Sequence, residues 1–273
     1  MAFGEDGLIA IVGDLHGNSE SLYLITASLG LTDSNLDWAA QNCSLIITGD
    51  ACDRGYDSAS IYKHMIKWQA QAPRLDSEVI FLIGNHEIMN IQGQLYYNTY
   101  EETASYGDGK SDGFIEKQQA FAAGGWLYEW LAEQPFIIAR GPFIIAHADF
   151  PAAYRNLTVK EIDKLSRRIF SGSGALFSEP DPLLWSRKAG LMPDYEEALK
   201  DFLEQNNARS WVCGHTPSVS RRMRRLFDNR YICVDTAMML GPENTSVLVF
   251  ESDALQAVYY DARGGSRIET LTL

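Results

Sequence analysis

Short apolar runs rich in β-branched residues recur in the first third of the chain, and each run ends at a polar loop that contains glycine. The three runs read LIAIV, SLIIT and VIFLI, and the loops after them read GDLHG, GDACDRG and GNHE. Between the first two runs, Leu22, Ile25 and Leu29 repeat with the spacing of a helix, and a similar repeat separates the second run from the third. This alternation predicts a β-α-β-α-β unit with a parallel sheet.

Residues 91–125 depart from this pattern. They are rich in Gly, Tyr and Gln, and they contain the stretch SYGDGKSDG. Their composition predicts a long loop inserted into the domain, of the kind that serves as a lid, as a binding insertion or as a disordered segment.

The second half of the chain begins with FIIARGPFIIAHAD, which predicts two strands joined by a Gly-Pro turn. Thr158 and Asp194 each begin a capping-box pattern, which predicts a helix after each of them. The final strand-like runs read SWVCG, YICVDTA, TSVLVFE and LQAVYYDA. Strands that first alternate with helices and then follow one another predict an α/β (α+β) fold of two mixed β-sheets, packed face to face with helices outside.

Composition and charge narrow the class of protein. The chain has 273 residues, 36 of them acidic and 23 basic, with a formal net charge of -13. Its length and apolar content predict a single domain over residues 1–273, with the insertion at 91–125. The acidic balance argues against nucleic acid and anionic membrane surfaces as partners, so a phosphate-bearing substrate needs a local positive site. No run of about 18 apolar residues occurs, so we expect no membrane span.

The cysteines form no pattern that predicts disulfides or a zinc site. The four are Cys43, Cys52, Cys213 and Cys233, too few and too scattered for a disulfide framework or a paired-cysteine zinc site. Most lie in or beside strand-like runs, where they are expected to pack as small apolar groups. We therefore expect a cytoplasmic location, with the periplasm or the extracellular medium open if a signal has been removed.

Side chains able to bind metal stand at or near the carboxyl ends of five apolar runs. They are Asp14, His16, Asp50, Asn85, His147 and His215. Ligands of open α/β sheets sit beyond the carboxyl ends of parallel strands, so these side chains are expected to converge.

The donor types favour two divalent ions. Two carboxylates, one amide oxygen and three imidazoles are too rich in oxygen for a structural zinc site and too rich in nitrogen for calcium. If Asp50 bridges the two ions, Asp14 and His16 are the other ligands of the first ion. Asn85, His147 and His215 are the other ligands of the second. Two such ions about 3.5 to 4 Å apart are a recurrent device for displacement at phosphorus.

These motifs, taken in order, resemble the metallophosphoesterase signature in its phosphoprotein phosphatase version. GNHEIMNIQG, LLWSRKAG and GHTPS look most like the Shewanella-like phosphatase branch, which is grouped with serine/threonine phosphatases and whose characterised members tend to favour phosphotyrosine. The resemblance runs from about residue 8 to about residue 235. It implies a four-layer sandwich, with two central sheets flanked by helices.

The resemblance also implies a role for each matching residue. Asp14, His16, Asp50, Asn85, His147 and His215 would bind the metals. His86 would protonate the leaving oxygen, and Asp53 would hold His86 in its acidic form. Arg54 would hold the phosphate, and Arg187 of LLWSR is a second candidate for this role, unless it merely stacks on Trp185.

The implied activity is that of a metal-dependent protein phosphatase acting on a phosphorylated protein or peptide. A hydroxide bridging two divalent ions would attack the phosphomonoester directly; Mn²⁺ is favoured, and Fe or Zn suits the same ligands. The same metal core serves dinucleotide polyphosphate hydrolases and phosphodiesterases, which are the alternative. A scaffold that has lost the chemistry is expected to lack ligands, whereas all six are present here together with His86.

Three features have roles that the sequence leaves open. The chain reads His147-Ala148-Asp149 where the family has His-Gly-Gly, so Asp149 is expected close to the second ion, supporting its ligands. The tyrosines of the 91–125 insertion either shape a pocket for an aromatic phosphoester or cover the core. The arginine-rich run 221–230 is interpreted as a solvated edge or hairpin rather than a docking or nucleic-acid site.

Overall fold

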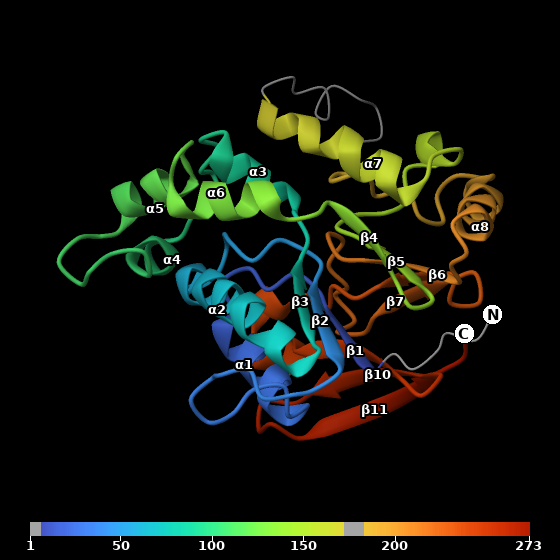
Figure 1. The fold of residues 1–273 in the computed structure, drawn as a ribbon, viewed down its shortest axis with the longest axis horizontal. Coiled ribbons are helices and arrows are strands. Elements are labelled where there is room, and N and C mark those ends of the chain that lie inside the picture. Colours follow the sequence, from blue (N-terminus) through green and yellow to red (C-terminus); the bar gives the residue numbers. More distant parts are fainter. Residues whose placement is uncertain (1–6, 172–182) are drawn as a thin grey trace.

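A computed structural model of the protein describes residues 7–171 and 183–273. Two mixed β-sheets pack face to face, and helices cover their outer faces (Figure 1). This architecture confirms the predicted fold class.

The larger sheet has six strands in the order β11-β10-β9-β1-β2-β3. The first three in the chain run parallel, and the C-terminal three are added antiparallel beside β1. Their bounds are β1 Leu8–Val12, β2 Cys43–Ile47, β3 Glu78–Phe81, β9 Ser246–Glu251, β10 Ala254–Tyr260 and β11 Ser266–Leu271. The predicted β-α-β-α-β unit is therefore present.

The smaller sheet has five strands in the order β4-β5-β6-β8-β7. Its central strands β5, β6 and β8 are parallel, and β4 and β7 are antiparallel edges. The bounds are β4 Ile137–Arg140, β5 Phe143–Ala146, β6 Ser210–Cys213, β7 Arg224–Leu226 and β8 Tyr231–Cys233. The carboxyl ends of parallel strands in both sheets are thus available to build one site.

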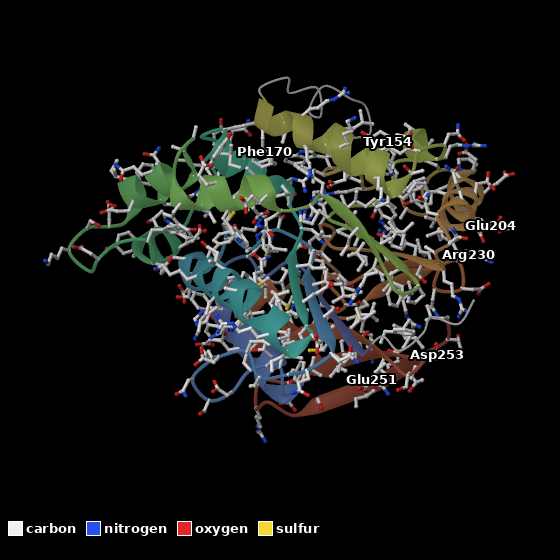
Figure 2. All side chains as sticks on the ribbon, viewed as in Figure 1. Tyr154, Phe170, Glu204, Arg230, Glu251 and Asp253 are labelled. Atoms are coloured by element: carbon white, nitrogen blue, oxygen red, sulfur yellow. The ribbon has the colours of Figure 1, made fainter. Side chains whose placement is uncertain are left out.

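The arginine-rich run 221–230 contains the edge strand β7 and the turn that leads to β8, in agreement with the interpretation as an edge or hairpin. Arg225 lies 2.6 Å from a carboxylate oxygen of Glu269, and Arg230 lies 3.3 Å from one of Glu196. Figure 2 shows Arg230 at the surface of the molecule, close to Glu204. The arginines therefore line the edge of the sheet, where they pair with glutamates of neighbouring elements.

Side-chain alternation assigns each face of a strand to one layer. In β1, Ile9 and Ile11 face the opposing sheet, whereas Ala10 and Val12 face the helices. These residues are almost fully buried, and burial of an isoleucine stabilises the fold by about 1.5 to 3 kcal/mol. The sandwich interior therefore holds the two sheets, and with them the strand ends, in one rigid frame.

The helices begin at residues that suit their capping positions. Their bounds are α1 Ser19–Ser28, α2 Ser58–Gln71, α3 Asn85–Ile91, α4 Tyr100–Ala104, α5 Phe114–Phe121, α6 Trp126–Glu133, α7 Val159–Ser166 and α8 Tyr195–Gln205. Thr158 and Glu161 form the predicted capping box of α7. The predicted box at Asp194 is wrong: α8 begins there, but the side chain of Asp194 makes no capping hydrogen bond, because its backbone does not adopt the extended conformation of a cap (φ -100°, ψ 7°). Among the described residues, no helix is both long enough and apolar enough to cross a bilayer.

The prediction of a long loop at 91–125 is wrong, because the segment contains helices α4 and α5. Thr99 caps α4 by accepting a hydrogen bond from the amide of Glu102 (3.1 Å). Glu102 and Lys117, polar in sequence, are both buried. The segment is therefore an integral part of the folded domain and lies in green beside α3 and α6 in Figure 1.

Candidate active site

The predicted metal-binding side chains converge at the carboxyl ends of strands from both sheets. His16 follows β1, Asp50 follows β2, His147 follows β5 and His215 follows β6, while Asn85 opens α3 after β3. Two groups of side chains bring their ligand atoms together, and within each group these atoms lie within 4.8 Å of one another. The first group is His16, Asp50 and His86, and the second is Asp50, His147 and His215. Asp50 is common to both groups, as a bridging ligand must be.

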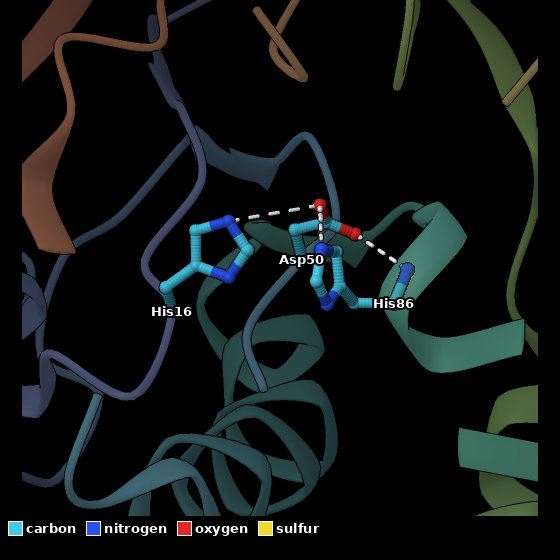
Figure 3. Close-up of side chains that lie close together, drawn as sticks. All are labelled: His16, Asp50 and His86. Carbon is cyan, nitrogen blue, oxygen red and sulfur yellow. Dashed lines mark hydrogen bonds and ion pairs between the residues drawn. The ribbon is translucent and has the colours of Figure 1, made fainter. Parts of the chain in front are cut away.

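The distances place Asp50 at the centre of the site. Its Oδ2 lies 3.4 Å from Nε2 of His147 and 3.8 Å from Nε2 of His16. Its Oδ1 accepts the backbone amide of His86 at 2.9 Å, an interaction drawn in Figure 3. Asn85 completes the second group, because its Oδ1 lies 2.9 Å from Nε2 of His147.

Backbone carbonyls orient two of the imidazoles. Nδ1 of His16 lies 2.8 Å from the carbonyl oxygen of Cys52, and Nδ1 of His147 lies 2.8 Å from that of Thr48. A carbonyl oxygen only accepts, so each Nδ1 carries the proton and each Nε2 turns its lone pair toward the site. His215 is arranged differently: Arg187 donates to its Nε2 at 3.0 Å, and its Nδ1 faces Nε2 of His147 at 3.2 Å.

Asp14 lies at the base of the site rather than in either group. Both of its carboxylate oxygens accept the amide of His215 at 3.0 Å. Burial, followed by the nearby carboxylates of Asp235 and Asp50, raises the pKa of Asp14 well above its ordinary value. The first group contains His86 beside His16 and Asp50, and Asp14 stays a predicted ligand of the same ion.

Asp235 is a site residue that the sequence analysis missed. It is buried, and burial raises the pKa of its carboxyl group to about 6. Asp235 follows the strand-like run YICV, so the strand-end rule that selected the other residues also applies to it. With Asp14 and Asp50 it forms a set of three buried carboxylates.

The donor set fits divalent metal ions. Lone pairs of His147 and Asn85 face each other at 2.9 Å, an arrangement that requires a proton or a cation between them. Burial lowers the pKa of His147, but the carboxylate of Asp50 outweighs it and raises that pKa overall, so the site attracts positive charge. Two dications would satisfy the three carboxylates and the imidazole lone pairs together.

Several predicted site residues adopt the strained left-handed backbone conformation. The φ angles are 43° for His16, 52° for Asp50, 68° for Asp53, 66° for Arg54 and 65° for His215. Such conformations cost about 1 to 3 kcal/mol each and persist only where neighbouring contacts enforce them. Glu87 supplies such contacts by accepting the amides of Asp50 and Ala51, each at 2.9 Å. The loops are therefore held in the geometry that aims these side chains at the site.

His86 and Asp53 form a buried pair beside the metal ligands. Nδ1 of His86 lies 2.6 Å from Oδ2 of Asp53. Burial pushes the pKa of His86 down, but Asp50 and the hydrogen bond to Asp53 outweigh it and raise that pKa. Burial likewise raises the pKa of Asp53, and its contacts with His86 and Lys117 lower it overall. His86 therefore tends to hold a proton, as a general acid must.

Two arginines line the pocket, one beside each group of metal-binding side chains. Nη2 of Arg54 lies 3.3 Å from Nε2 of His86, and Arg187 contacts His215. The pocket has a volume of about 130 Å³, and both arginines line it together with Tyr97 and Trp185. These guanidinium groups provide the local positive charge that an acidic protein needs in order to bind phosphate.

A family comparison agrees with this geometry. The sequence profile of the family described as calcineurin-like phosphoesterase matches residues 7–219. The chain belongs to the calcineurin-like phosphoesterase family. This membership confirms the prediction of a phosphoesterase, and with the residue clusters above it makes the protein a divalent-metal-binding enzyme.

Relatives of this phosphoesterase support the Shewanella-like branch. It is 28% identical to Shewanella-like protein phosphatase 1 of Plasmodium berghei over 86% of this chain and 68% of that protein. Among solved structures, the cold-active protein-tyrosine phosphatase of a psychrophilic Shewanella species has a TM-score of 0.80 at 24% identity, covering 97% of this chain and 80% of that one. A serine/threonine phosphatase from Saccharomyces cerevisiae has a TM-score of 0.64 at 16% identity, covering 100% and 82%. The predicted resemblance is thereby confirmed, and the two solved structures share the fold.

Asp149 of the phosphoesterase is placed differently from the sequence-based expectation. Its carboxylate accepts the hydroxyl of Tyr231 and the amide of Ala189 (2.7 Å), and it lies 3.5 Å from Arg224. Its own amide donates to the carbonyl of Ser186 at 3.3 Å. Asp149 therefore ties both sides of Arg187 to the sheet, and its carboxylate turns toward the 186–189 loop instead of supporting a metal ligand.

Proposed function

We propose that this phosphoesterase is a metal-dependent protein phosphatase that hydrolyses phosphomonoesters of proteins or peptides, with phosphotyrosine favoured over phosphoserine and phosphothreonine. The observation that carries the proposal is the juxtaposition of Arg54, Arg187 and His86 around one small pocket above the ligands. Arginine forks match phosphate oxygens, and a protonated imidazole beside them meets the leaving oxygen.

The volume of the pocket favours a single phosphoryl group. Sites for drug-sized ligands occupy about 300 to 1,000 Å³, whereas this pocket has a volume of about 130 Å³. A phosphate and the first atoms of its ester fill such a volume, while a dinucleotide polyphosphate extends well beyond it. The size of the pocket therefore supports a phosphomonoesterase over the alternative activities.

Aromatic side chains at the pocket support an aryl ester. Tyr97 is 43% exposed, with its ring centroid 5.0 Å from that of His86, and the guanidinium of Arg54 lies 4.5 Å from the centroid of Tyr97. Trp185 is 37% exposed and lies edge-on to His215 with centroids 6.0 Å apart. Contact between these exposed rings and the ring of a phosphotyrosine would stabilise substrate binding. A phosphoserine has no ring to make this contact.

The residues of the chain divide the reaction between them. When bound, two divalent ions, which we propose to be Mn²⁺, would supply acidified water and offset the charge of the phosphate. His16, Asp50, Asn85, His147 and His215, with Asp14 beneath them, would hold these ions. Arg54 and Arg187 would orient the phosphate oxygens, and His86 would donate its Nε2 proton to the departing oxygen. Asp53 would fix the ring of His86 through Nδ1 and stabilise its charged form.

A cytoplasmic location is part of the proposal. The four cysteines are free and buried, which suits a reducing compartment. A phosphorylated protein or peptide is the expected partner there.

A substrate panel tests this function. Purified protein loaded with Mn²⁺ would be assayed with a phosphotyrosine peptide, the matching phosphoserine peptide and a dinucleotide tetraphosphate, with the His86→Asn variant as a control for contaminating phosphatase. We expect the phosphotyrosine peptide to have the highest kcat/KM. Predominant cleavage of the dinucleotide would overturn the proposal.

A further inference from the structure

Lys117 is a buried lysine that the mechanism has not used. It comes from α5 in the 91–125 insertion, and only 1% of its side chain is exposed. Its Nζ lies 3.2 Å from Oδ1 of Asp53 and 2.9 Å from Oε1 of Glu102. The carboxylates of Asp53 and Glu102 are also buried. A charge removed from water in this way requires partners, and here one partner is the residue that orients His86.

The two oxygens of Asp53 have separate partners. Oδ2 faces Nδ1 of His86 at 2.6 Å, whereas Oδ1 faces Lys117 at 3.2 Å and the side-chain amide of Asn98 at 3.0 Å. Asn90 donates to both oxygens at 3.1 Å. The insertion therefore holds the oxygen that does not contact His86, and this leaves the carboxylate one orientation in which Oδ2 meets the imidazole.

The insertion also holds the strained backbone beneath these groups. The amide of Asp53 donates to Oε1 of Glu102 at 2.7 Å, and the amide of Arg54 donates to the carbonyl of Tyr97 at 2.8 Å. Asp53 and Arg54 are the two consecutive residues with φ near 65° to 70° described above. Since such a turn persists only where its surroundings enforce it, the insertion fixes the acid pair and the phosphate-binding arginine together.

The environment of Lys117 makes its charge hard to replace. Its Nζ lies 5.8 Å from the ring centroid of Tyr106 and 5.7 Å from that of Phe121, so aromatic faces rather than water complete its surroundings. Without the ammonium group, two carboxylates would share a buried space with no positive charge between them. Asp53 would then turn toward a proton donor or water and away from its fixed position.

We propose that Lys117 is a positioning residue of the phosphatase reaction: by pairing with Oδ1 of Asp53, it keeps Oδ2 on His86 and the proton-bearing face of His86 toward the leaving group. The inference rests on the proposed function. It assigns the 91–125 insertion to the catalytic apparatus, where the sequence left open a pocket-shaping or a merely covering role.

Leaving-group dependence tests this inference. Protonation of the leaving oxygen matters for phenyl phosphate, whose leaving group is poor, and matters little for 2,4-dinitrophenyl phosphate, whose leaving group departs as a stable anion. We expect Lys117→Met to lower kcat for phenyl phosphate about tenfold or more relative to kcat for 2,4-dinitrophenyl phosphate. A loss of active protein lowers both rates equally. Lys110→Met, an exposed lysine of the same insertion, is the matched control and is expected to change neither rate.

A charge-balanced variant separates positioning from stability. Glu102→Gln combined with Lys117→Met removes one charge of each sign, and Gln keeps an oxygen for the amide of Asp53. We expect this variant to unfold at a higher temperature than Lys117→Met and still to show the selective loss on phenyl phosphate. An unchanged ratio of the two rates in either folded variant overturns the inference. Failure of both variants to fold also overturns it, because Lys117 would then serve stability alone. If the wild-type protein hydrolyses neither aryl phosphate, the proposed function fails instead.

Discussion

Replacement of His86 by Asn tests the assignment of the general acid. The substitution removes the imidazole but keeps the backbone amide that donates to Oδ1 of Asp50 at 2.9 Å, so Asp50 keeps its orientation and both metal sites are expected to remain. What is lost is the proton donor held by Asp53 at 2.6 Å. General acid catalysis contributes about 100- to 10,000-fold to a rate, which corresponds to about 2.7 to 5.4 kcal/mol of transition-state stabilisation.

The assay measures kcat on the phosphotyrosine peptide together with metal content by elemental analysis. We expect His86→Asn to lower kcat by about 100-fold or more with unchanged metal content. His64→Asn, a histidine of α2 that does not line the pocket, is the control. A wild-type rate in the His86 variant, or a loss of rate that follows a loss of metal, would show that His86 is not the general acid.

Three other changes test separate parts of the site. Asp50→Asn is expected to abolish activity and weaken both metal sites, and two fully occupied ions in elemental analysis would contradict a bridging role. Asp149→Asn is expected to loosen the 186–189 loop through the amide of Ala189, raising KM and the inhibition constant of inorganic phosphate several-fold with a smaller effect on kcat; equal losses in both would argue against it. Asp235 has a pKa raised to about 6 from an ordinary 3.8, so the stability its protonated form provides is complete below pH 3.8 and is lost as the pH rises through 6. Metal-free Asp235→Asn is therefore expected to gain up to about 3 kcal/mol of unfolding free energy at pH 7, a gain that disappears near pH 4 in thermal denaturation; a gain independent of pH would contradict the cause.

The strand-end rule explains how much of the site is visible in the sequence. His16, Asp50, His147 and His215 each follow a short apolar run, and a parallel sheet necessarily brings such positions to one edge. The same rule applies to Asp235, which follows β8. It was missed because β8 lies in the strand-rich end of the chain, where no intervening helix marks it as parallel to β6. The order of the strands in the two sheets decides which of the late strands end at the site. This order cannot be derived from local sequence patterns.

The 91–125 segment shows where sequence patterns fail. Its Gly-rich composition is typical of loops, but Glu102 and Lys117 fold inward and neutralise each other next to Asp53. A charged residue in a polar segment is ordinarily solvent-exposed, so nothing local distinguishes a buried ion pair from a surface one. Asp149 is a similar case, since its direction depends on Tyr231 and Arg224 from another part of the sheet.

The proposed reaction depends on two cations that lie on either side of Asp50. Crystals grown with Mn²⁺ and measured for anomalous scattering at the manganese edge test it directly. We expect two peaks per chain, with the carboxylate of Asp50 in contact with both, His16 beside the first, and His147 and His215 beside the second. A single peak, no peak, or an Asp50 side chain directed away from the metal would contradict it.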